Sequence, residues 1–268
     1  MDEMLTQKLD RLNELLSGYD SVLVAYSGGV DSTFLATAAH RVLGARALAV
    51  TAQSESLAPE ELEEAQAHAA RLGFAHAVIR TEELSDPNYT SNPRERCYFC
   101  KSELMDKLVK VAATRGLRKI ALGAIVDDLG DFRPGEAAAR ERGAVFPLRD
   151  AGLLKAEIRV LSRDWGLPTA DKPGGACLSS RIPFGEEVTA RKLEQIAKGE
   201  ACLHTLGFRE CRVRHHGTTA RVEVPVAQLP ALLAVREEVV REFKALGFVF
   251  VSVDLQGLRS GSLHEALI

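Results

Sequence analysis

The sequence lacks the features that mark membrane-embedded and secreted proteins. None of its apolar runs approaches the roughly 18 consecutive residues that a membrane-spanning helix needs. The segment 1–19 is acidic, polar and amphipathic, without the basic flank and apolar stretch of a signal peptide. We therefore expect a cytoplasmic protein with no membrane partner.

Neither sign of charge is in large excess. The 268-residue chain carries 34 Lys and Arg against 37 Asp and Glu, which gives a net charge of −3. This balance argues against sequence-independent binding of nucleic acid, because such binding depends on a basic surface. Hydrophobic residues make up 46% of the chain and charged residues 26%, so the composition excludes a disordered chain and allows one large domain or two smaller ones.

Cysteine is scarce, and its odd count excludes a disulfide framework in a reducing compartment. The five cysteines are Cys97, Cys100, Cys177, Cys202 and Cys211. Their number directs attention to metal ligation or thiol chemistry. Cys202 and Cys211 have apolar neighbours in the sequence, and we interpret them as small core residues.

Short apolar runs alternate with helical patterns over the first part of the chain. Strands are expected at 21–26, 47–51, 75–80 and 119–123, and helices at 5–16, 31–43, 59–72 and 101–115. Strands that alternate with helices predict an α/β fold with a parallel sheet covered on both faces. We assign this first domain to residues 1–170.

The rest of the chain has a different pattern. The segment 171–185 contains Pro and Gly and is too long for a simple connection, so we interpret it as a functional loop between domains. In 186–268 we expect helices at 189–206 and 228–246 and strands at 209–215, 220–224 and 248–255. This order predicts a small α+β domain with helices on one face of an antiparallel sheet.

The first predicted strand is followed by a glycine-containing loop with the sequence Ser27-Gly28-Gly29-Val30-Asp31-Ser32, which opens a helix. Glycines let the backbone approach an anion, and the N–H groups of a helix N-terminus attract it. The carboxylate of Asp31 would repel bare phosphate, so we expect it to act through Mg²⁺. The alternative is a glycine turn that serves only tight packing.

This loop resembles the pyrophosphate loop (PP-loop) of the N-type ATP pyrophosphatases, which adenylate a substrate and release pyrophosphate. The resemblance implies an adenine-nucleotide alpha-hydrolase-like parallel sheet with ATP at the carboxyl ends of its strands. On this basis the ATP-binding residues are Ser27, Gly28, Gly29, Asp31, Ser32, Val50 and Gly123.

Three cysteines lie in settings that suggest chemistry. Cys97 and Cys100 form a Cys-x2-Cys pair at the start of a predicted helix, beside basic residues that favour thiolates. The pair alone could be a redox dithiol, half of a zinc site, two packed thiols or ligands of a cluster. Cys177 lies within the loop, between two glycines and the segment that ends at Arg181, and we interpret it as a working thiol.

Arginines in the second part suggest an anion site. Arg212 and Arg214 alternate on a predicted strand and therefore share one face, which suits a nucleotide phosphate. The alternative is a solvated sheet face with Glu223 as an ion-pair partner. Three acidic residues could bind Mg²⁺, order arginines or cap helices: Asp127, Asp128 and Asp131.

Taken in order, these motifs resemble the LarE-type ATP-dependent sulfur transferases of nickel-pincer nucleotide synthesis. The resemblance covers nearly the whole chain and rests on the PP-loop and on residues 127–135, 172–185, 212–214, 220–224 and 259–262. It implies an enzyme that adenylates the carboxylates of pyridinium-3,5-biscarboxylic acid mononucleotide and converts them to thiocarboxylates, for the cofactor of lactate racemase. It also implies ATP and Mg²⁺ as cofactors and a homo-oligomer of the hexameric kind.

The resemblance assigns roles to individual residues. In the family's single-cysteine branch, the cysteine at the position of Cys177 gives up its own sulfur. Because this chain also has Cys97 and Cys100, it looks like the three-cysteine branch, in which these thiols hold a [4Fe-4S] cluster whose open iron can bind the sulfide nucleophile. The source of the sulfur, the sulfide donor and any fourth cluster ligand stay open. The substrate's phosphate and carboxylates are assigned to Arg181, Arg212, Arg214 and Glu223.

Three other functions stay open at this point. A tRNA-thiolating enzyme of the same superfamily could also use three cysteines, but it would need a basic RNA-binding surface. A glutamine-dependent amidotransferase subunit would adenylate its substrate without any use for the thiols. A nucleotide-binding regulator would hold structural zinc, which iron and sulfide analysis distinguishes from a cluster.

Overall fold

The computed structural model describes residues 2–130, 133–259 and 262. Asp131, Phe132, Ser260 and Gly261, which belong to motifs identified above, lie outside the described residues. The chain divides into two units, the first made of residues 2–54, 59–83 and 95–175 and the second of 55–58, 84–94 and the chain from 176 onward. Among the helices that the structure describes, none has the length and apolar character needed to span a bilayer.

The first unit is built on a four-stranded parallel sheet with the order β3-β2-β1-β4. Its strands are β1 (Val22–Ala25), β2 (Ala47–Gln53), β3 (His76–Arg80) and β4 (Lys119–Ala121). Each strand leads into a helical segment before the next strand begins, which is the connection that parallel strands require. The predicted α/β class with a parallel sheet is confirmed.

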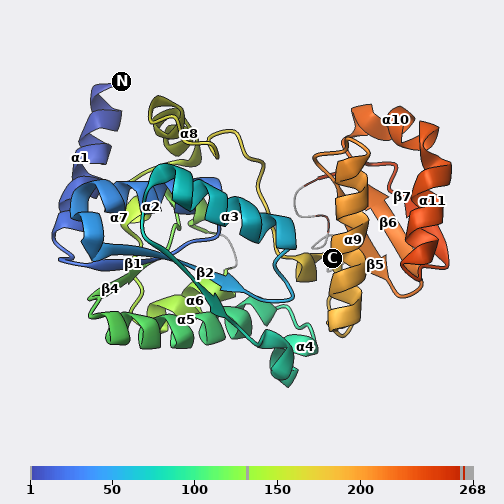
Figure 1. Ribbon diagram of the computed structural model, residues 1–268, viewed down its shortest axis with the longest axis horizontal. Coiled ribbons are helices and arrows are strands. Elements are labelled where there is room, and N and C mark those ends of the chain that lie inside the picture. Colours follow the sequence, from blue (N-terminus) through green and yellow to red (C-terminus); the bar gives the residue numbers. More distant parts are fainter. Residues whose placement is uncertain (1, 131–132, 260–261, 263–268) are drawn as a thin grey trace. The chain divides into compact units, whose positions relative to one another are not determined.

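Helices cover both faces of this sheet (Figure 1). On one face lie α2 (Val30–Leu43) and α3 (Pro59–Leu72), and α1 (Glu3–Ser17) and α8 (Lys155–Asp164) pack against α2. The other face is covered by α5 (Arg96–Arg115) and α6 (Pro134–Glu141). This unit also contains the short helix α7 (Pro147–Asp150) and the 3-10 turns η1 (Gly44–Arg46) and η3 (Val126–Asp128). A further 3-10 turn, η2 (Glu83–Ser85), begins at Glu83 of the first unit and continues into the second.

The alternation of side chains along β1 explains its continuous apolar run. Val22 and Val24 are buried in a cluster with residues of α1 and α2, including Phe34. Leu23, which points the opposite way, is buried in a cluster with Met105 and Leu108 of α5. Both faces of the strand are therefore in apolar surroundings, as expected for a parallel sheet between two helical layers.

The second unit contains a three-stranded sheet with the order β5-β6-β7. Its elements are α4 (Pro87–Thr90), η4 (Leu178–Arg181), α9 (Ala190–Thr205), β5 (Arg212–His216), β6 (Thr219–Glu223), η5 (Val226–Gln228), α10 (Leu229–Ala234), α11 (Arg236–Ala245) and β7 (Phe250–Val253). The segment 84–94 belongs here because the side chain of Asn92 donates to the carbonyl oxygens of Pro183 and Glu186, at 2.7 and 3.0 Å.

Two expectations for this unit were wrong in detail. The sheet is not fully antiparallel: β5 and β6 form an antiparallel hairpin, but β7 pairs with β6 in parallel. The reason is the helical crossover between β6 and β7, since strands joined in this way pair in parallel. The single helix expected at 228–246 is two helices, α10 and α11, which are separated at Val235.

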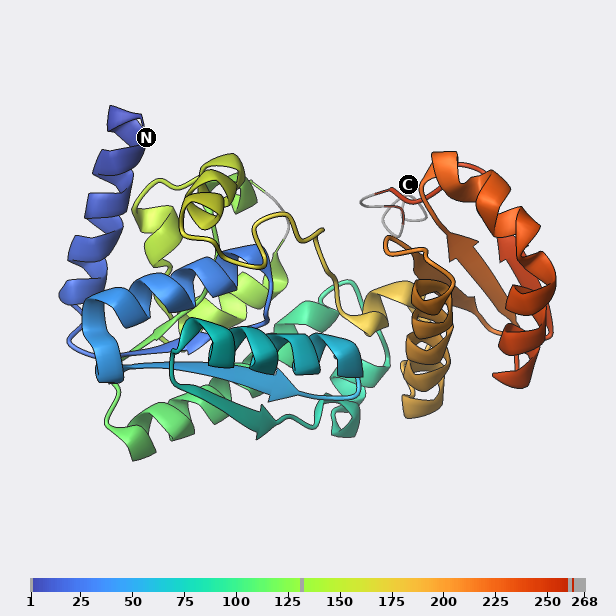
Figure 2. The same ribbon diagram turned by 45° about the horizontal axis from the view of Figure 1, so that its top comes forward.

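One face of this sheet is apolar and the other polar. Val213 and Val222 are paired across β5 and β6 and are buried with Phe243 of α11. A Cβ on Gly199 of α9 would lie 3.2–3.3 Å from Phe243 and Val213, so α9 and α11 share this apolar face. These helices, gold and deep orange in Figure 2, lie against the sheet. The opposite face carries the alternating polar residues of the hairpin, Arg212, Arg214, Arg221 and Glu223.

Candidate functional site

The PP-loop, residues 27–32, has a backbone that requires glycine. Gly28 has a φ of 72°, and a Cβ at this position would lie 3.0 Å from the Cβ of Ala65 in α3. A larger residue would therefore be strained and would clash. Gly29 is the N-cap of α2, and no side chain caps this helix. The first N–H groups of α2 are thus available in the way that an anion site at a helix N-terminus needs.

Hydroxyl groups hold the loop in shape. Ser32 Oγ accepts a hydrogen bond from Ser27 N and donates to Gly29 O, both at 3.2 Å, and the two serine hydroxyls are 3.1 Å apart. Gly123, just beyond β4, lies so close that a Cβ there would be 3.2 Å from Ser32 N. The structure therefore brings together the predicted residues from the PP-loop and from the end of β4.

The carboxylate of Asp31 lies in the first turn of α2 and has two different environments. Its Oδ2 lies 2.6 Å from Nζ of Lys155, and its Oδ1 is buried without a hydrogen-bond partner in the described part of the chain. Lys155 is the first residue of α8, and its N–H donates to Oδ2 of Asp127 at 2.9 Å. Sequence reasoning missed Lys155, which is 124 positions away from Asp31.

The surroundings of Asp31 fit a magnesium ion. Mg²⁺ binds to proteins through one or two carboxylates together with phosphate oxygens, and Oδ1 of Asp31 is a carboxylate oxygen without a partner in the described residues. The neighbouring acids have other contacts. Asp127 accepts from the backbone of Lys155, and Asp128 accepts from Ile125 N at 2.9 Å and pairs with Arg133 at 2.7 Å.

The chain beyond α8 returns to the PP-loop. The ammonium of Lys172 donates to Gly28 O at 3.4 Å and to Glu64 of α3 at 2.8 Å. Arg159 of α8 donates to the carbonyl oxygens of Ala170 and Lys172. The start of the loop 171–185 is thus held against the PP-loop within the first unit.

Val50, to which adenine was assigned, lies at the core of the sheet. It is buried in β2, and its carbonyl oxygen accepts from Tyr26 N at 2.8 Å. The hydroxyl of Thr51, the next residue, donates to Tyr26 O at the same distance. The contact between adenine and main-chain groups at this strand stays a prediction.

Cys97 and Cys100 lie in the first turns of α5, which begins at Arg96, ahead of the predicted start. They are three residues apart, so they lie on the same side of the helix. Neither is in a disulfide bond, and Cys97 is exposed whereas Cys100 is half-buried. Cys100 Sγ lies 3.7 Å from Oε1 of Glu83, a buried carboxyl whose pKa is raised by burial. Glu83 also accepts from Thr81 at 3.0 Å, and sequence reasoning missed it.

No group of three His, Cys, Asp or Glu side chains that could hold a metal ion occurs within residues 2–130, 133–259 and 262. Cys97 and Cys100 belong to the first unit and Cys177 to the second. The centre built from all three thiols therefore stays a prediction.

In the second unit, Arg181 organises the backbone around Cys177. Arg181 is 3% exposed, and its guanidinium donates to both carboxylate oxygens of Glu200, at 2.9 and 3.0 Å. It also donates to the carbonyl oxygens of Ala176 and Cys177, at 2.6 and 3.2 Å. Cys177 itself is exposed. Glu200, in the middle of α9, is a partner that sequence reasoning missed.

The polar face of the hairpin holds a buried ion pair. Arg214 donates to both oxygens of Glu223, at 3.0 and 2.9 Å, and also to Ser180 O and Ser262 Oγ. The ion pair that the alternative interpretation expected is therefore present, but Glu223 is fully buried rather than solvated. Burial and the nearby charge of Arg181 lower the pKa of Arg212. The four residues assigned to the substrate thus lie in one unit, and their role in binding stays a prediction.

Replacing Glu223 with alanine is expected to destabilise the second unit. The substitution leaves Arg214 buried without its carboxylate, and breaking a buried pair from one side costs about 3–5 kcal/mol of unfolding free energy. Urea unfolding followed by circular dichroism measures the loss. The exposed Glu237, replaced in the same way, is the control. Equal stability of the two variants would contradict the role of the pair.

Cys211 is expected to resist alkylation in the folded protein. Burial raises the pKa of its thiol to about 12, and the Glu200 carboxylate adds to the shift. At pH 8 only about one molecule in ten thousand then carries the thiolate there. In protein freed of metal, iodoacetamide should label the exposed Cys97 and Cys177 first, and Cys211 only after unfolding in guanidinium. Peptide mass spectrometry measures the order, and early labelling of Cys211 would contradict its burial.

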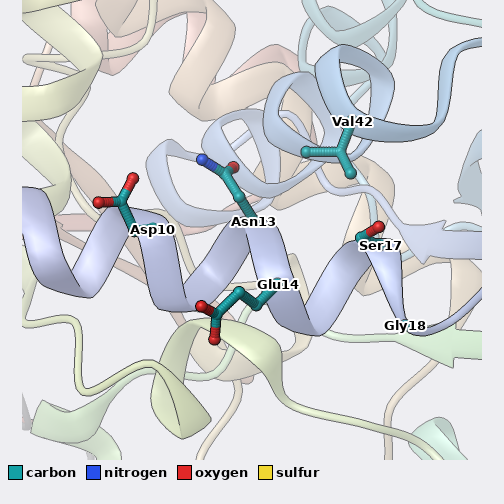
Figure 3. A pocket seen from close by; sticks show the side chains of 6 residues that line it. All are labelled: Asp10, Asn13, Glu14, Ser17, Gly18 and Val42. Carbon is teal, nitrogen blue, oxygen red and sulfur yellow. The ribbon is translucent and has the colours of Figure 1, made fainter.

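A depression on the surface between α1 and α2 lies apart from these residues (Figure 3). It encloses about 640 Å³ and is lined by Asp10, Asn13, Glu14, Ser17, Gly18 and Val42. None of these lining residues is one that the sequence analysis assigned to ATP, substrate or metal.

Comparison with known proteins places these observations among relatives. No protein-family model matches the chain. An uncharacterised protein of Synechocystis is 46% identical over 98% of this chain and 99% of its own length. The pyridinium-3,5-bisthiocarboxylic acid mononucleotide synthase of Lactiplantibacillus plantarum is 35% identical over 98% of this chain and 96% of its own length. A tRNA-specific 2-thiouridylase of Rickettsia peacockii is 28% identical over 57% of this chain and 52% of its own length.

Proposed function

The chain belongs to the LarE-type family of ATP-dependent sulfur transferases, enzymes of the PP-loop class, and we propose that it converts pyridinium-3,5-biscarboxylic acid mononucleotide to its thiocarboxylates. The relative from Lactiplantibacillus plantarum is named for the corresponding bisthiocarboxylic acid product. The observation that carries the proposal is the contact of Lys172 with Gly28, which holds the start of the segment that leads to Cys177 beside the PP-loop.

The first step is activation of a carboxylate on the PP-loop. A carboxylate oxygen of the substrate attacks the α-phosphorus of ATP, and pyrophosphate leaves with the electron pair of the broken P–O bond. The product is an acyl-adenylate, whose leaving group is AMP. The N–H groups at the start of α2 and the hydroxyls of Ser27 and Ser32 would hold the phosphates, and Gly123 leaves them room. Main-chain groups of Val50 would hold adenine.

Asp31 would hold a magnesium ion through Oδ1. The ion would neutralise the charge that develops on the leaving pyrophosphate. One carboxylate is enough for this purpose, because the phosphate oxygens supply further ligands. The pairing of Oδ2 with Lys155 leaves Oδ1 for the metal.

In the second step a sulfur nucleophile attacks the acyl carbon and AMP leaves, which produces the thiocarboxylate. Cys97, Cys100 and Cys177 would hold a [4Fe-4S] cluster, which when bound supplies an iron that carries sulfide. In the other route, the thiolate of Cys177 attacks the acyl carbon and AMP leaves. The resulting thioester then loses the proton on Cα of residue 177, and the Cβ–S bond breaks, so that the sulfur leaves with the thiocarboxylate. That route leaves dehydroalanine at position 177 and consumes the protein's own sulfur.

The position of Cys177 in the sequence supports both routes. The segment from Lys172 to Cys177 is short, and its fully extended reach is about 18 Å. Lys172 contacts Gly28 and Glu64, so the tether of Cys177 begins at the nucleotide loop. On a tether of this length the thiol would be able to reach an acyl-adenylate formed at the PP-loop.

We place the substrate's phosphate and second carboxylate on the polar face of the hairpin. The residues assigned to them are Arg181, Arg212, Arg214 and Glu223. Bidentate contacts with Glu200 and Glu223 hold the side chains of Arg181 and Arg214 in place. On the basis of the family, we also propose that the substrate is a small nucleotide, that the protein is cytoplasmic and that it forms a hexameric homo-oligomer.

Pyrophosphate release tests the substrate. Anaerobically purified protein with MgATP is expected to release pyrophosphate on addition of the pyridinium dicarboxylate nucleotide, and mass spectrometry should detect the thiocarboxylate. Unmodified tRNA is the competing substrate, because a tRNA thiolase is among the relatives. The net charge of −3 argues against RNA. Pyrophosphate release with tRNA alone would overturn the proposal.

Metal analysis tests the cluster separately. The anaerobic protein is expected to contain about four irons with matching sulfide. The Cys97→Ala variant should lose this iron, and Cys202→Ala, which changes a half-buried thiol of the second unit, should keep it. If the protein contains zinc in place of iron, the proposed cluster is wrong, whereas the proposed adenylation step is unaffected.

A further inference from the structure

We propose that Lys155 is a positioning residue for adenylation: it neutralises and orients the carboxylate of Asp31, so that Oδ1 faces the metal and the phosphate chain of ATP is not repelled. This inference rests on the proposed function, since it concerns the same nucleotide loop. Neither the PP-loop motif nor the cysteine motifs include Lys155.

The geometry of the pair supports an orienting role. Nζ of Lys155 lies 2.6 Å from Oδ2 of Asp31, while Oδ1 is buried without a partner in the described chain. One oxygen is therefore held by a cation and the other is not. A carboxylate fixed in this way can offer a single oxygen to Mg²⁺ without losing its orientation.

Lys155 is itself held in place. Its N–H donates to Oδ2 of Asp127 at 2.9 Å, and α8, which begins at Lys155, is anchored in the core by the buried Ile158 and Leu161. The ammonium thus extends from a fixed helix start to the first turn of α2. Its side chain is 33% exposed, so it lies at the edge of the site rather than in the core.

The charges give the pair a second role. Asp31 stands at the N-terminus of α2, where the phosphates of ATP would bind, and two negative groups about 4 Å apart repel by at least about 1 kcal/mol. The ammonium of Lys155 compensates this charge before any metal does. Without Lys155, ATP that carries no metal should be repelled, whereas MgATP brings its own positive charge.

The experiment compares binding of ATP in EDTA with binding of MgATP by calorimetry, for the full chain and its variants. Lys155→Met is expected to weaken binding of metal-free ATP by about tenfold and to weaken MgATP binding less. Lys155→Arg, which keeps the charge, should bind metal-free ATP nearly as tightly as the unaltered protein. The double variant Lys155→Met, Asp31→Asn should regain binding of metal-free ATP, because no negative charge then needs compensation.

A matched ion pair on the same helix provides the control. Lys8 of α1 lies 2.7 Å from Glu157 of α8, and the side chains of that pair are 25% and 21% exposed. Lys8→Met should leave both affinities unchanged. If Lys155→Met lowers both affinities equally, or if Asp31→Asn restores nothing, Lys155 has only a structural role and the inference falls. If the unaltered protein binds no ATP, the proposed function falls with it.

Discussion

Replacement of Cys177 by alanine is expected to abolish thiocarboxylate formation while the rate of pyrophosphate release in a single turnover stays within about twofold of that of the unaltered protein. Both proposed routes need the Cys177 sulfur, as a cluster ligand or as the nucleophile, so sulfur transfer should fall by at least about a thousandfold. The side chain of Cys177 is exposed and the folded chain does not depend on it for packing. The two half-reactions should therefore separate, and the acyl-adenylate should accumulate.

Cys202 provides the matched control for this variant. It is a free thiol of the same unit, half-buried against the core, and burial raises the pKa of its thiol. Cys202→Ala should leave both half-reactions unchanged. Normal thiocarboxylate formation by Cys177→Ala would refute the role of Cys177, whatever the substrate proves to be.

Variants of the Cys-x2-Cys pair distinguish the two sources of sulfur. If the sulfur comes from Cys177 alone, Cys97→Ala and Cys100→Ala should still complete one turnover, and the protein should lose the elements of hydrogen sulfide. If all three thiols act together, each of these variants should lose sulfur transfer as Cys177→Ala does. Intact-protein mass spectrometry after a single turnover therefore decides between them.

The sequence was sufficient to predict those parts of the site whose residues are neighbours along the chain. The PP-loop is one segment of six residues that follows a strand and runs into a helix, and hydrogen bonds among its own serines and Gly29 hold its shape. The parallel sheet was predictable for a similar reason, because a short apolar run such as β1 can be buried only between two layers. Both inferences depend on local pattern.

The partners of the site residues could not be predicted in this way. Lys155, Glu83 and Glu200 are ordinary charged residues, and nothing in the spacing of their neighbours separates them from charges that face water. Only the fold brings them to Asp31, Cys100 and Arg181. The parallel pairing of β7 is different, because the helix expected between the last two strands is the kind of crossover that parallel strands need, although an antiparallel sheet was predicted.

Neither unit contains all three thiols of the proposed cluster. Cys97 and Cys100 are set by the first turns of α5, and Cys177 by the Arg181 contacts of the second unit. Each half of the proposed centre is thus built locally and independently. The domain limits of 1–170, 171–185 and 186–268 stay a prediction for the same reason.

Asp31→Ala is expected to lower pyrophosphate release by about 10²–10³-fold, the loss typical when one electrostatic stabiliser of a transition state is removed. The variant lacks the oxygen that would hold Mg²⁺ against the leaving pyrophosphate, so added Mg²⁺ should not restore the rate. Binding of metal-free ATP should not weaken, because the ammonium of Lys155 then faces the phosphates without its counter-charge. A low rate together with intact binding would assign Asp31 to catalysis.

A second aspartate–cation pair of the same unit makes this result specific. Asp106 lies 2.7 Å from Arg142 on an exposed part of the first unit, so Asp106→Ala removes a carboxylate and an ion pair without touching the loop. It should keep the normal rate of pyrophosphate release. Circular dichroism should show the same helix content for both variants. If Asp31→Ala releases pyrophosphate at the normal rate, the metal is held elsewhere, and the orienting role of Lys155 loses its purpose as well.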